Sequence, residues 1–359
     1  MAAAYALRVN SRRPTLDTVA RAVGVSRATV SNAYNRPDQL SERLRTEILA
    51  AAASLGYAGP DPVARSLATR RAGAVAVMLE KGLSAAFSDP ALSIMLDTLA
   101  STVDTGERSL VLMPGGTEGG GPKPSAVAAV HADVVVAYSL QTNAPAITAV
   151  QQRNLPYVVV DQPVVPDVPT VRVDDRVGAR MAARHVVDLG HRDIGVISLL
   201  LAADGHQGPP SPQRRKAAQF QVTADRLAGY LDVLPTEPPV WEAPDSRREY
   251  GRSAANWLLT QTPRPTALLC MSDELALGAL RAASDLGLPV PENLTIVGFD
   301  DTPAAAWANL TTVRQDLLEK GRTTGDLVLS LLEGNRPTTP VTIGVALVTR
   351  GTSGPTPPR

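Results

Sequence analysis

Polar side chains with hydrogen-bonding chemistry gather on one side of a short predicted helix near the N-terminus, in RATVSNAYN at 27–35. At about 100° per residue, the side chains that fall on one face are Arg27, Ala28, Ser31, Asn32 and Asn35. Val30 and Ala33 point the opposite way. Arginine, serine and asparagine can bond base edges and phosphates. We interpret this helix as one that lies in DNA; an ordinary amphipathic helix with a solvated polar face is the alternative.

Two further helices must position this one. The preceding segment has an apolar face at helical spacing, formed by Leu16, Val19, Ala20 and Val23. Gly24 ends that helix, and Ser26 caps the next. A third helix is predicted over 41–56, capped by Ser41, with a stripe of Leu44, Ile48, Ala52 and Leu55. The pattern predicts a three-helix head.

The charge of the chain is distributed unevenly, although it sums to zero. Residues 1–71 contain 11 arginines and 5 acidic residues, a net charge of +6, and the remainder carries −6. A basic head on an acidic body suits a nucleic-acid-binding domain joined to a regulatory one.

From Gly73 onward, short apolar runs alternate with amphipathic helical patterns. Most of the runs are predicted to be buried parallel strands: 74–79, 109–114, 133–138, 157–161, 193–198, 267–271 and 294–300. The clearest helical patterns cover 89–103, 177–189 and 272–286. This alternation predicts an α/β architecture with two doubly wound sheets. Pro/Gly-rich stretches at 114–124, 204–216 and the C-terminal tail are expected to be surface loops or disordered. The long basic loop 202–222 either covers a ligand site or lacks order.

Length, cysteine content and hydropathy limit the class of protein. A chain of 359 residues is expected to hold two or three domains. The single cysteine, Cys270, excludes an intramolecular disulfide and fits a reducing cytoplasm. The N-terminus does not have the pattern of a secretory signal, and no apolar run approaches the ~20 residues of a membrane span. The sequence therefore predicts a cytoplasmic protein that does not enter the membrane.

Motifs of enzymes are weak or incomplete. HRD at 191–193 lies between a helix end and a strand, without the other kinase motifs. GGTEGGGPK lacks the GK[ST] of a phosphate-binding loop, and no G-x-S-x-G occurs. The four histidines have no metal-binding spacing. We expect neither catalysis, nor a metal, nor a cofactor.

Taken together, these residues resemble the lactose-repressor (LacI/GalR) family of bacterial transcription regulators. TLDTVARAVGVSRATVSNAYN resembles the family's helix-turn-helix headpiece, and VARSLATRRAGAVAV its hinge helix entering the core. RLAGY, MSDELALGALRAASDLGLPVPENLTIVGFDD and LTTVRQ match the family's core in order and spacing. The resemblance implies an all-α headpiece and a core of two doubly wound α/β subdomains, like that of periplasmic binding proteins. It also implies a homodimer.

The resemblance also implies domain boundaries. The headpiece would cover 1–59, with about 15–57 ordered, and the hinge 60–72. The first core subdomain would comprise 73–170 and about 301–330; the second, 171–300 and about 331–352. Residues 353–359 would be a flexible tail.

The family's DNA-contacting positions carry over onto the head and hinge. Arg27, Ala28 and Asn32 match base-reading positions, while Thr29, Ser31 and Asn35 are candidates for phosphate contacts. Tyr57 matches a tyrosine that packs near the hinge. In the hinge itself the expected DNA contacts are Ala64 and Leu67, and Leu67 matches a leucine that wedges into the minor groove. The alternative is that Leu67 packs against the core or a partner helix.

Four positions match the family's ligand-binding residues, namely Asp161, Arg226, Ser272 and Asp300. The two aspartates end predicted strands, where open α/β sheets bind ligands, and a carboxylate can accept from adjacent hydroxyls of a sugar. A helix cap or an interdomain ion pair is the alternative for either aspartate. Phe87 and Tyr138 follow strands and could stack on a ring or pack in the core.

The sequence thus predicts a sequence-specific regulator, a repressor, that binds a palindromic DNA operator as a dimer. A small polar effector, a sugar or related metabolite, would bind between the core subdomains. The alternative is a cytoplasmic solute-binding protein without a role in DNA regulation.

Overall fold

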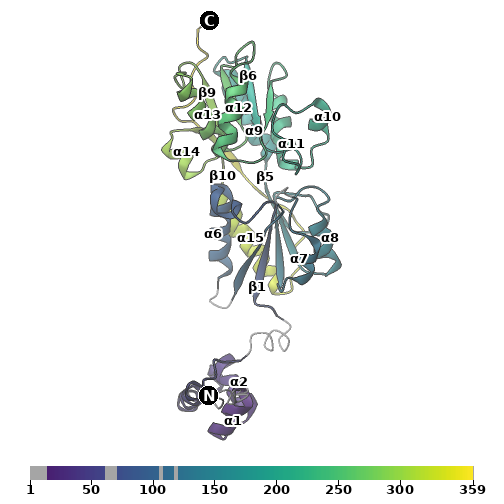
Figure 1. Ribbon diagram of the computed structural model, residues 1–359, viewed down its shortest axis with the longest axis vertical. Coiled ribbons are helices and arrows are strands. Elements are labelled where there is room, and N and C mark those ends of the chain that lie inside the picture. The colour runs from purple at the N-terminus through teal and green to yellow at the C-terminus, as the bar shows by residue number, and fades with distance from the viewer. Residues whose placement is uncertain (1–13, 61–70, 105–107, 117–119, 359) are drawn as a thin grey trace, which may run out of the picture. The chain divides into compact units, whose positions relative to one another are not determined.

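The computed structural model describes residues 14–60, 71–104, 108–116 and 120–358. The chain divides into two compact units, Met1–Ala72 and Gly73–Arg359. The first unit holds the predicted three helices, α1 (Leu16–Val23), α2 (Arg27–Asn35) and α3 (Glu42–Ser54), and a short 3₁₀ turn at Pro37–Gln39 (Figure 1).

The ends of these helices follow the predicted capping residues. Gly24 ends α1 with a φ of 72°, a left-handed conformation that glycine adopts without steric cost. The Ser26 hydroxyl accepts from the Thr29 N–H at 3.0 Å, and the Ser41 hydroxyl from the Leu44 N–H at 3.4 Å. The helices pack on a small core of Val19, Ala20, Val30, Ala33, Ile48 and Ala52. Because Val30 and Ala33 face this core, the polar face of α2 is turned outward.

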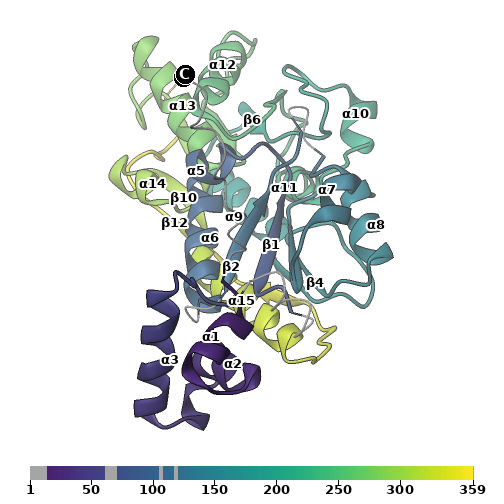
Figure 2. The ribbon, with the colours of Figure 1, turned by 60° about the horizontal axis from the view of Figure 1, so that its bottom comes forward.

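The second unit contains two six-stranded sheets (Figure 1). The first has the order β11-β5-β4-β3-β1-β2 and is parallel throughout. Its strands, in chain order, are β1 (Ala74–Leu79), β2 (Ser109–Met113), β3 (Val134–Tyr138), β4 (Tyr157–Val160), β5 (Thr170–Val173) and β11 (Val341–Ile343). Helices cover both faces: α5 (Ala85–Ser88), α6 (Pro90–Val103) and α15 (Leu317–Leu332) on one side, α7 (Pro124–Ala129) and α8 (Pro145–Gln152) on the other (Figure 2).

The second sheet has the order β12-β10-β9-β8-β6-β7. Its strands are β6 (Ile194–Ser198), β7 (Val240–Glu242), β8 (Ala267–Cys270), β9 (Thr295–Asp300), β10 (Thr311–Gln315) and β12 (Val345–Val348), of which β12 is antiparallel to β10. Helices α9 (Asp175–Asp188) and α11 (Gln221–Leu231) cover one face, α12 (Arg248–Leu258) and α13 (Asp273–Asp285) the other. The two short helices of this half are α10 (Pro212–Lys216) and α14 (Pro303–Trp307). The predicted α/β fold with two doubly wound subdomains is confirmed.

The boundaries between the subdomains differ from those expected. Strand β10 lies in the second sheet, although residues from about 301 were assigned to the first subdomain. Strand β11 lies in the first sheet, although residues from about 331 were assigned to the second. The chain therefore crosses between subdomains after β5, after β10 and between β11 and β12 (Figure 1). An apolar run predicts a strand, but it does not indicate which of two similar sheets the strand joins.

Two segments are better ordered than their composition predicted. Within 204–216, Arg214 donates to buried Glu242 at 2.6 and 2.8 Å and to Asp204 at 2.7 and 2.8 Å. The expected flexible tail is also held: His191 Nε2 lies 3.0 Å from the Gly354 carbonyl, and the Thr356 N–H donates to Leu189. The composition of a Pro/Gly-rich segment gives no indication of long-range hydrogen bonds of this kind. Among the helices of the described residues, none is long and apolar enough to cross a membrane.

The Arg214–Glu242 pair should contribute to the stability of the second subdomain. The Glu242 side chain is fully buried, so Arg214→Met would leave an unpaired charge inside the fold. We expect the free energy of unfolding to fall by about 3–5 kcal/mol in urea titrations. The control is Arg281→Met on α13, whose ion pair with Asp285 is 69% exposed at the arginine and should contribute at most about 1 kcal/mol. Equal losses in the two variants would contradict the assignment.

Candidate functional site

The outward face of α2 presents the predicted DNA-contacting side chains. Arg27 and Ala28 are exposed, and Arg27 lies 3.9 Å from the carboxylate of Asp17, with both side chains mostly in solvent. Asn35 is exposed as well, whereas Ser31 and Asn32 are half-buried. The Arg27 guanidinium is thus free to reorient toward a partner. The predicted face is present as one surface of a single helix.

Weak hydrogen bonds arrange the polar side chains of this face. The Asn35 amide donates to the Ser31 hydroxyl at 3.1 Å, and the Asn32 amide to Gln39 Oε1 at 3.4 Å. The Thr29 hydroxyl lies 2.8 Å from that of the capping residue Ser26. These bonds between exposed groups exchange readily with other partners, because water competes for them.

Two tyrosine rings pack against each other within the head. The Tyr57 ring meets the Tyr34 ring edge-on, at a centroid distance of 6.0 Å and an interplanar angle of 83°. Tyr57 therefore packs on α2 itself, which the sequence analysis did not foresee because Tyr34 lies outside the polar face. The predicted hinge contacts Ala64 and Leu67 lie outside the described residues.

In the core, the structure brings three of the predicted ligand-binding residues into one network. Asp161 follows β4, Asp300 ends β9, and Arg226 lies on α11. The backbone of Asp161 has a φ of 62° and that of Asp300 a φ of 124°, values that non-glycine residues rarely adopt. Such conformations persist where surrounding contacts impose them and are frequent at binding sites.

A chain of bonds connects Asp161 to Asp300 across the subdomain boundary. The buried Lys320 ammonium of α15 donates to Asp161 Oδ1 at 2.8 Å and to Gln315 Oε1 at 2.6 Å. The Gln315 amide in turn donates to Asp300 Oδ1 at 2.6 Å. Asp161 is therefore ion-paired, but with a lysine of its own subdomain and not across the boundary as the alternative for it expected. Asp300 accepts from an amide.

Arg226 continues this chain within the second subdomain. Its Nε donates to Asp175 Oδ1 at 2.7 Å, its Nη1 donates to the Met271 carbonyl, and its Nη1 lies 3.9 Å from Asp300. The guanidinium also stacks on Phe299, 3.6 Å from the ring centroid. We refer to the six connected residues as the junction cluster: Asp161, Asp175, Arg226, Asp300, Gln315 and Lys320.

Burial dominates the electrostatics of the junction cluster. Burial raises the pKa of Asp300 well above its usual range, although Arg226 opposes this rise. Burial also raises the pKa of Asp175, again against the effect of Arg226. The pKa of the Tyr138 hydroxyl at the end of β3 is raised by burial and then by the charges of Asp161, Asp89 and Asp300. Burial is the largest of these causes, and Arg226 opposes the carboxylates.

The other predicted ligand-binding residues differ in their surroundings. The Ser272 hydroxyl accepts from the Leu275 N–H at 3.2 Å and caps α13. Phe87 is 76% exposed on α5, so it is not a core residue. Tyr138 is half-buried against the apolar core of the first sheet. The Tyr138 hydroxyl is affected by the charges of the junction cluster, and Ser272 directly follows Met271, whose carbonyl accepts from Arg226.

Direct hydrogen bonds also tie the two subdomains together. The Lys81 ammonium donates to the Pro244 carbonyl at 2.6 Å, and the Ser246 hydroxyl donates to Asp89 Oδ2 at 2.9 Å. Lys81 and Asp89 belong to the first subdomain, the other two residues to the second.

The loop 202–222 takes part in the same contact. The Gln219 carbonyl accepts from the Thr142 N–H at 2.9 Å, and the Val222 N–H donates to Gln162 Oε1 at 2.8 Å. Thr142 and Gln162 follow β3 and β4 of the first sheet. The loop is therefore ordered and bonded to the first subdomain, so the expectation that it lacks order is wrong; that it covers a ligand site stays a prediction.

Sequence reasoning missed Lys320, Gln315 and Asp175, although one signal was available. Lys320 interrupts a stripe on α15 whose other buried members are Leu317, Gly321, Thr324, Gly325, Val328 and Leu331. A lysine on the apolar side of a helix indicates a buried ion pair, because an unpaired ammonium is too costly to bury. Nothing in the spacing identifies Asp161 as its partner, since the two are 159 positions apart.

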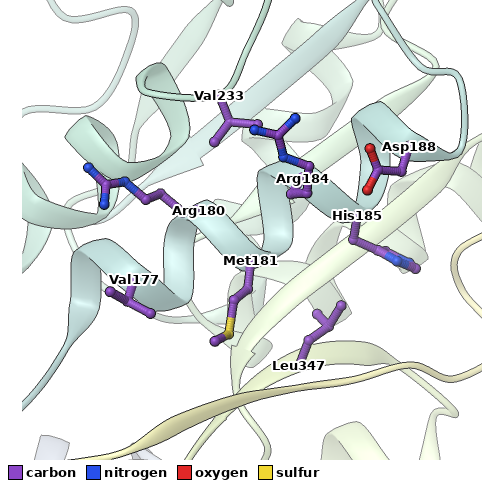
Figure 3. Close-up of a pocket in the computed structure, with 8 residues that line it drawn as sticks. All are labelled: Val177, Arg180, Met181, Arg184, His185, Asp188, Val233 and Leu347. Atoms are coloured by element: carbon purple, nitrogen blue, oxygen red, sulfur yellow. The ribbon is translucent and has the colours of Figure 1, made fainter.

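Two other features lie apart from these sites. His191 of the HRD segment is buried and bonds Thr266 and Gly354, so it has a structural role. An open groove of about 600 Å³ runs along α9 and is lined by Arg180, Met181, Arg184, His185 and neighbours (Figure 3). It contains none of the predicted site residues.

A helix-turn-helix head with an exposed polar second helix, joined to a two-subdomain α/β core, defines a DNA-binding protein with a ligand-binding-type core. Family models agree: the one for "Bacterial regulatory proteins, lacI family" matches residues 15–59, and the one for a "Periplasmic binding protein-like domain" matches 183–353. An HTH-type transcriptional regulator of Mycolicibacterium smegmatis is 42% identical over 330 residues, 88% of this chain and 90% of that protein. The chain belongs to the lacI family of bacterial regulatory proteins.

Solved structures show the same architecture. The lac repressor dimer bound to operator and the anti-inducer ONPF superimposes with a TM-score of 0.74 at 27% identity, over 96% of this chain and 100% of that one. The complex of the transcriptional regulator CelR with cellobiose has a TM-score of 0.66 at 25% identity, over 95% and 100%.

The Arg226–Asp175 pair should stabilise the part of the junction cluster that lies in the second subdomain. Arg226→Leu removes the cation and leaves Asp175 buried without a counter-ion. We expect a loss of about 3–5 kcal/mol in the free energy of unfolding. The double variant Arg226→Leu with Asp175→Leu should lose less than Arg226→Leu alone, because the buried carboxylate that Arg226 bonds most directly is removed with it. A double variant as unstable as the sum of the single ones would refute the pairing.

Proposed function

We propose that this protein is a sequence-specific transcription regulator, a repressor, that binds a near-palindromic DNA operator as a homodimer. The observation that carries the proposal is the outward polar face of α2 on a capped, basic three-helix head. The lac repressor structure, which is a dimer on its operator, supports this assignment. Because such a protein works where the chromosome is, we place it in the cytoplasm and assign it no catalytic role.

For DNA recognition, we assign base contacts to Arg27 and Asn32 and phosphate contacts to Thr29, Ser31 and Asn35. Arginine can donate two bonds to guanine, and asparagine suits adenine. Ala28 offers only an apolar contact, and Tyr57 supports α2 from behind through Tyr34. From its sequence position, we keep Leu67 as the proposed minor-groove wedge and Ala64 as its neighbour in the hinge.

For control, we propose that a small polar effector binds at the junction cluster. Asp161, Arg226 and Asp300 are held there by partners that, within the described parts of the chain, leave another atom of each side chain without a hydrogen bond. Ser272, Tyr138 and Phe87 are the further candidates for ligand contact, at the periphery. CelR in complex with cellobiose shows that a protein of this architecture accepts a sugar.

One exposed apolar surface of the core is a candidate for the dimer interface. Trp307 on α14 is 92% exposed, the most exposed of the large apolar side chains described. Leu286, at the end of α13, is 52% exposed. Helices α13 and α14 lie at one edge of the core (Figure 1). Exposed apolar residues of this size mark protein interfaces, and we place the second copy at this edge.

A footprint on the intergenic DNA flanking the protein's own gene tests the proposal. It is run at physiological salt, with and without pooled neutral sugars. A protected palindrome that disappears or sharpens with one pool supports regulator, operator and effector class together. A plain solute-binding protein would give no protection, and its weak DNA binding would lack the steep salt dependence that several phosphate contacts produce.

Arg27 should carry sequence discrimination. Arg27→Met should weaken operator binding by about 10- to 100-fold, corresponding to about 1–3 kcal/mol, and relax selectivity at one base pair in each half-site. The control, Arg43→Met on α3, removes the same charge from an exposed position outside α2. Competition titrations with single-base operator variants measure both. Uniform weakening across all variants would assign Arg27 to a phosphate instead.

Asp300 should be required for the effector response. Asp300→Asn keeps an acceptor for Gln315 but removes the charge facing Arg226. Loss of a charge-assisted bond of about 1.5–3 kcal/mol weakens the ligand by about 10- to 100-fold. Ligand titrations of the operator complex measure this, with Asp326→Asn on the exposed side of α15 as control. An unchanged titration midpoint would remove Asp300 from the site.

A further inference from the structure

The outward side of helix α9 carries two rows of side chains that the function proposed above does not use. The inward side of α9 packs on the second sheet through Ala182, Ala183 and Val186. The arginines of the outward side are spaced four residues apart and are all exposed: Arg176, Arg180 and Arg184. Next to them, at the same spacing, are Val177, Met181 and His185. Because residues four apart share one face of a helix, α9 presents a basic row beside a largely apolar one.

All of these outward side chains except Arg176 line the groove of about 600 Å³ described above. Figure 3 shows Met181 on the same side of α9 as Leu347 of β12, and Arg184 on the side of Val233. Met181 is 36% exposed. A pocket for a small molecule encloses most of its ligand, whereas an open groove along a helix suits a chain segment. Methionine and arginine are also enriched where proteins contact one another.

The positive charge of this face is only partly neutralised within the fold. Arg176 donates to Asp232 from two nitrogens, each at 2.8 Å, and Arg180 donates to the same carboxylate at 2.7 Å. The hydrogen bond from Arg176 is the main cause that holds the pKa of Asp232 below its usual range. Asp225 adds only a weaker attraction for Arg176. Two guanidinium groups therefore share one directly bonded carboxylate.

Arg184 is the least committed of the three arginines. Among the residues that the structure describes, no ion pair or side-chain hydrogen bond involves it. Its N–H donors are therefore available, in a planar fork that matches a carboxylate. Burial lowers the pKa of His185, so this neighbour is neutral near neutral pH and adds no charge. Asp188, at the end of the groove, is the one acidic residue that lines it.

We propose that the outward face of α9 is a docking site for an acidic segment of a partner protein. Carboxylates of the partner bond Arg180 and Arg184, and an apolar side chain of the partner covers Met181 and Leu347. The core as a whole is acidic, so this face differs from its surroundings and attracts a segment that they repel. Nucleic acid fits less well, because its phosphates would approach Asp188 and would leave the apolar row uncovered.

A peptide-display selection on the full-length protein tests this assignment. Random linear peptides are selected on the immobilised protein after removal of those that bind the variant Arg184→Glu. This removal step also discards acidic peptides that bind the basic head. We expect the remaining peptides to carry several acidic residues next to a large apolar one. Their affinity, measured by fluorescence anisotropy, should fall as salt is added, because exposed charges are screened.

Further variants supply evidence that does not depend on the selection step. Met181→Gln keeps the length of the side chain and should weaken a selected peptide by about three- to tenfold, because an apolar contact is lost. Asp232→Asn should strengthen it by about threefold or more, because the two arginines that Asp232 binds become available. The matched control is Arg264→Glu, an exposed arginine between α12 and β8 of the same subdomain, which should leave the affinity unchanged.

Several results would overturn the proposal. One is that no peptide distinguishes the protein from Arg184→Glu, or that the selected peptides lack acidic residues or do not respond to Met181→Gln and Asp232→Asn. A loss of non-operator DNA binding in Arg184→Glu as large as the loss of peptide binding would assign the face to nucleic acid. A change in oligomeric state in sedimentation velocity would assign it to a second copy of the chain.

Operator protection is measured on the same variants. Arg184→Glu should leave it unchanged, because α9 belongs to the core and not to the DNA-binding head. Failure of peptide docking with intact operator protection would therefore overturn the role of α9 alone. Absence of operator protection together with peptide docking would overturn the regulator function and leave the docking site standing.

Discussion

The need to neutralise buried charge at the subdomain boundary constrains the rest of the core. Five charged side chains and one amide are connected from Asp161 through Lys320 and Gln315 to Asp300, and from Arg226 to Asp175. Removing one partner from a buried pair costs about 3–5 kcal/mol, because the other charge is left without compensation. The helices and strands that bear these residues are therefore fixed relative to one another within narrow limits. The unusual backbone of Asp161 and Asp300 is maintained by these bonds.

Two residues of the junction cluster lie next to the segments that cross between the subdomains. Asp175 opens α9 directly after the first crossover, and Gln315 ends β10 directly before the second. A ligand that competes for Asp161 or Asp300 therefore acts on groups that sit at the segments crossing between subdomains. A coupling of 1–3 kcal/mol is sufficient for typical allosteric control. This coupling free energy is smaller than the loss in stability when one partner of a buried pair is removed. A modest rearrangement of the cluster can therefore shift the equilibrium between states of the core.

Local patterns predicted much of this structure, and long-range pairings did not follow from them. The capping residues Ser26 and Ser41, the inward Val30 and the apolar strands of both sheets act through neighbours a few positions away. The Lys320–Asp161 pair, the Arg214–Glu242 pair and the assignment of β10 to the second sheet depend on positions brought together by the fold. Asp161 and Asp300 were placed correctly at strand ends, but the residues that neutralise and orient them were not. The hydrophobic period and the secondary-structure propensity of a segment describe one helix or strand at a time. The partner of a buried charge lies on another helix or strand.

The two candidate functional regions differ in the kind of recognition that each can provide. On α2 the predicted recognition groups are exposed or half-buried and make few bonds, so a partner must supply most of the order. At the junction cluster the groups are buried and already bonded, so a ligand has to match the remaining donors and acceptors. Exposed arginine on a basic head favours a polyanion whose sequence is read by a few contacts. Buried side chains that are already paired leave few free donors and acceptors, and a hydroxyl suits such a site because it can both donate and accept. The two kinds of recognition use groups on different units of the chain, so DNA and a small ligand would not compete for the same atoms.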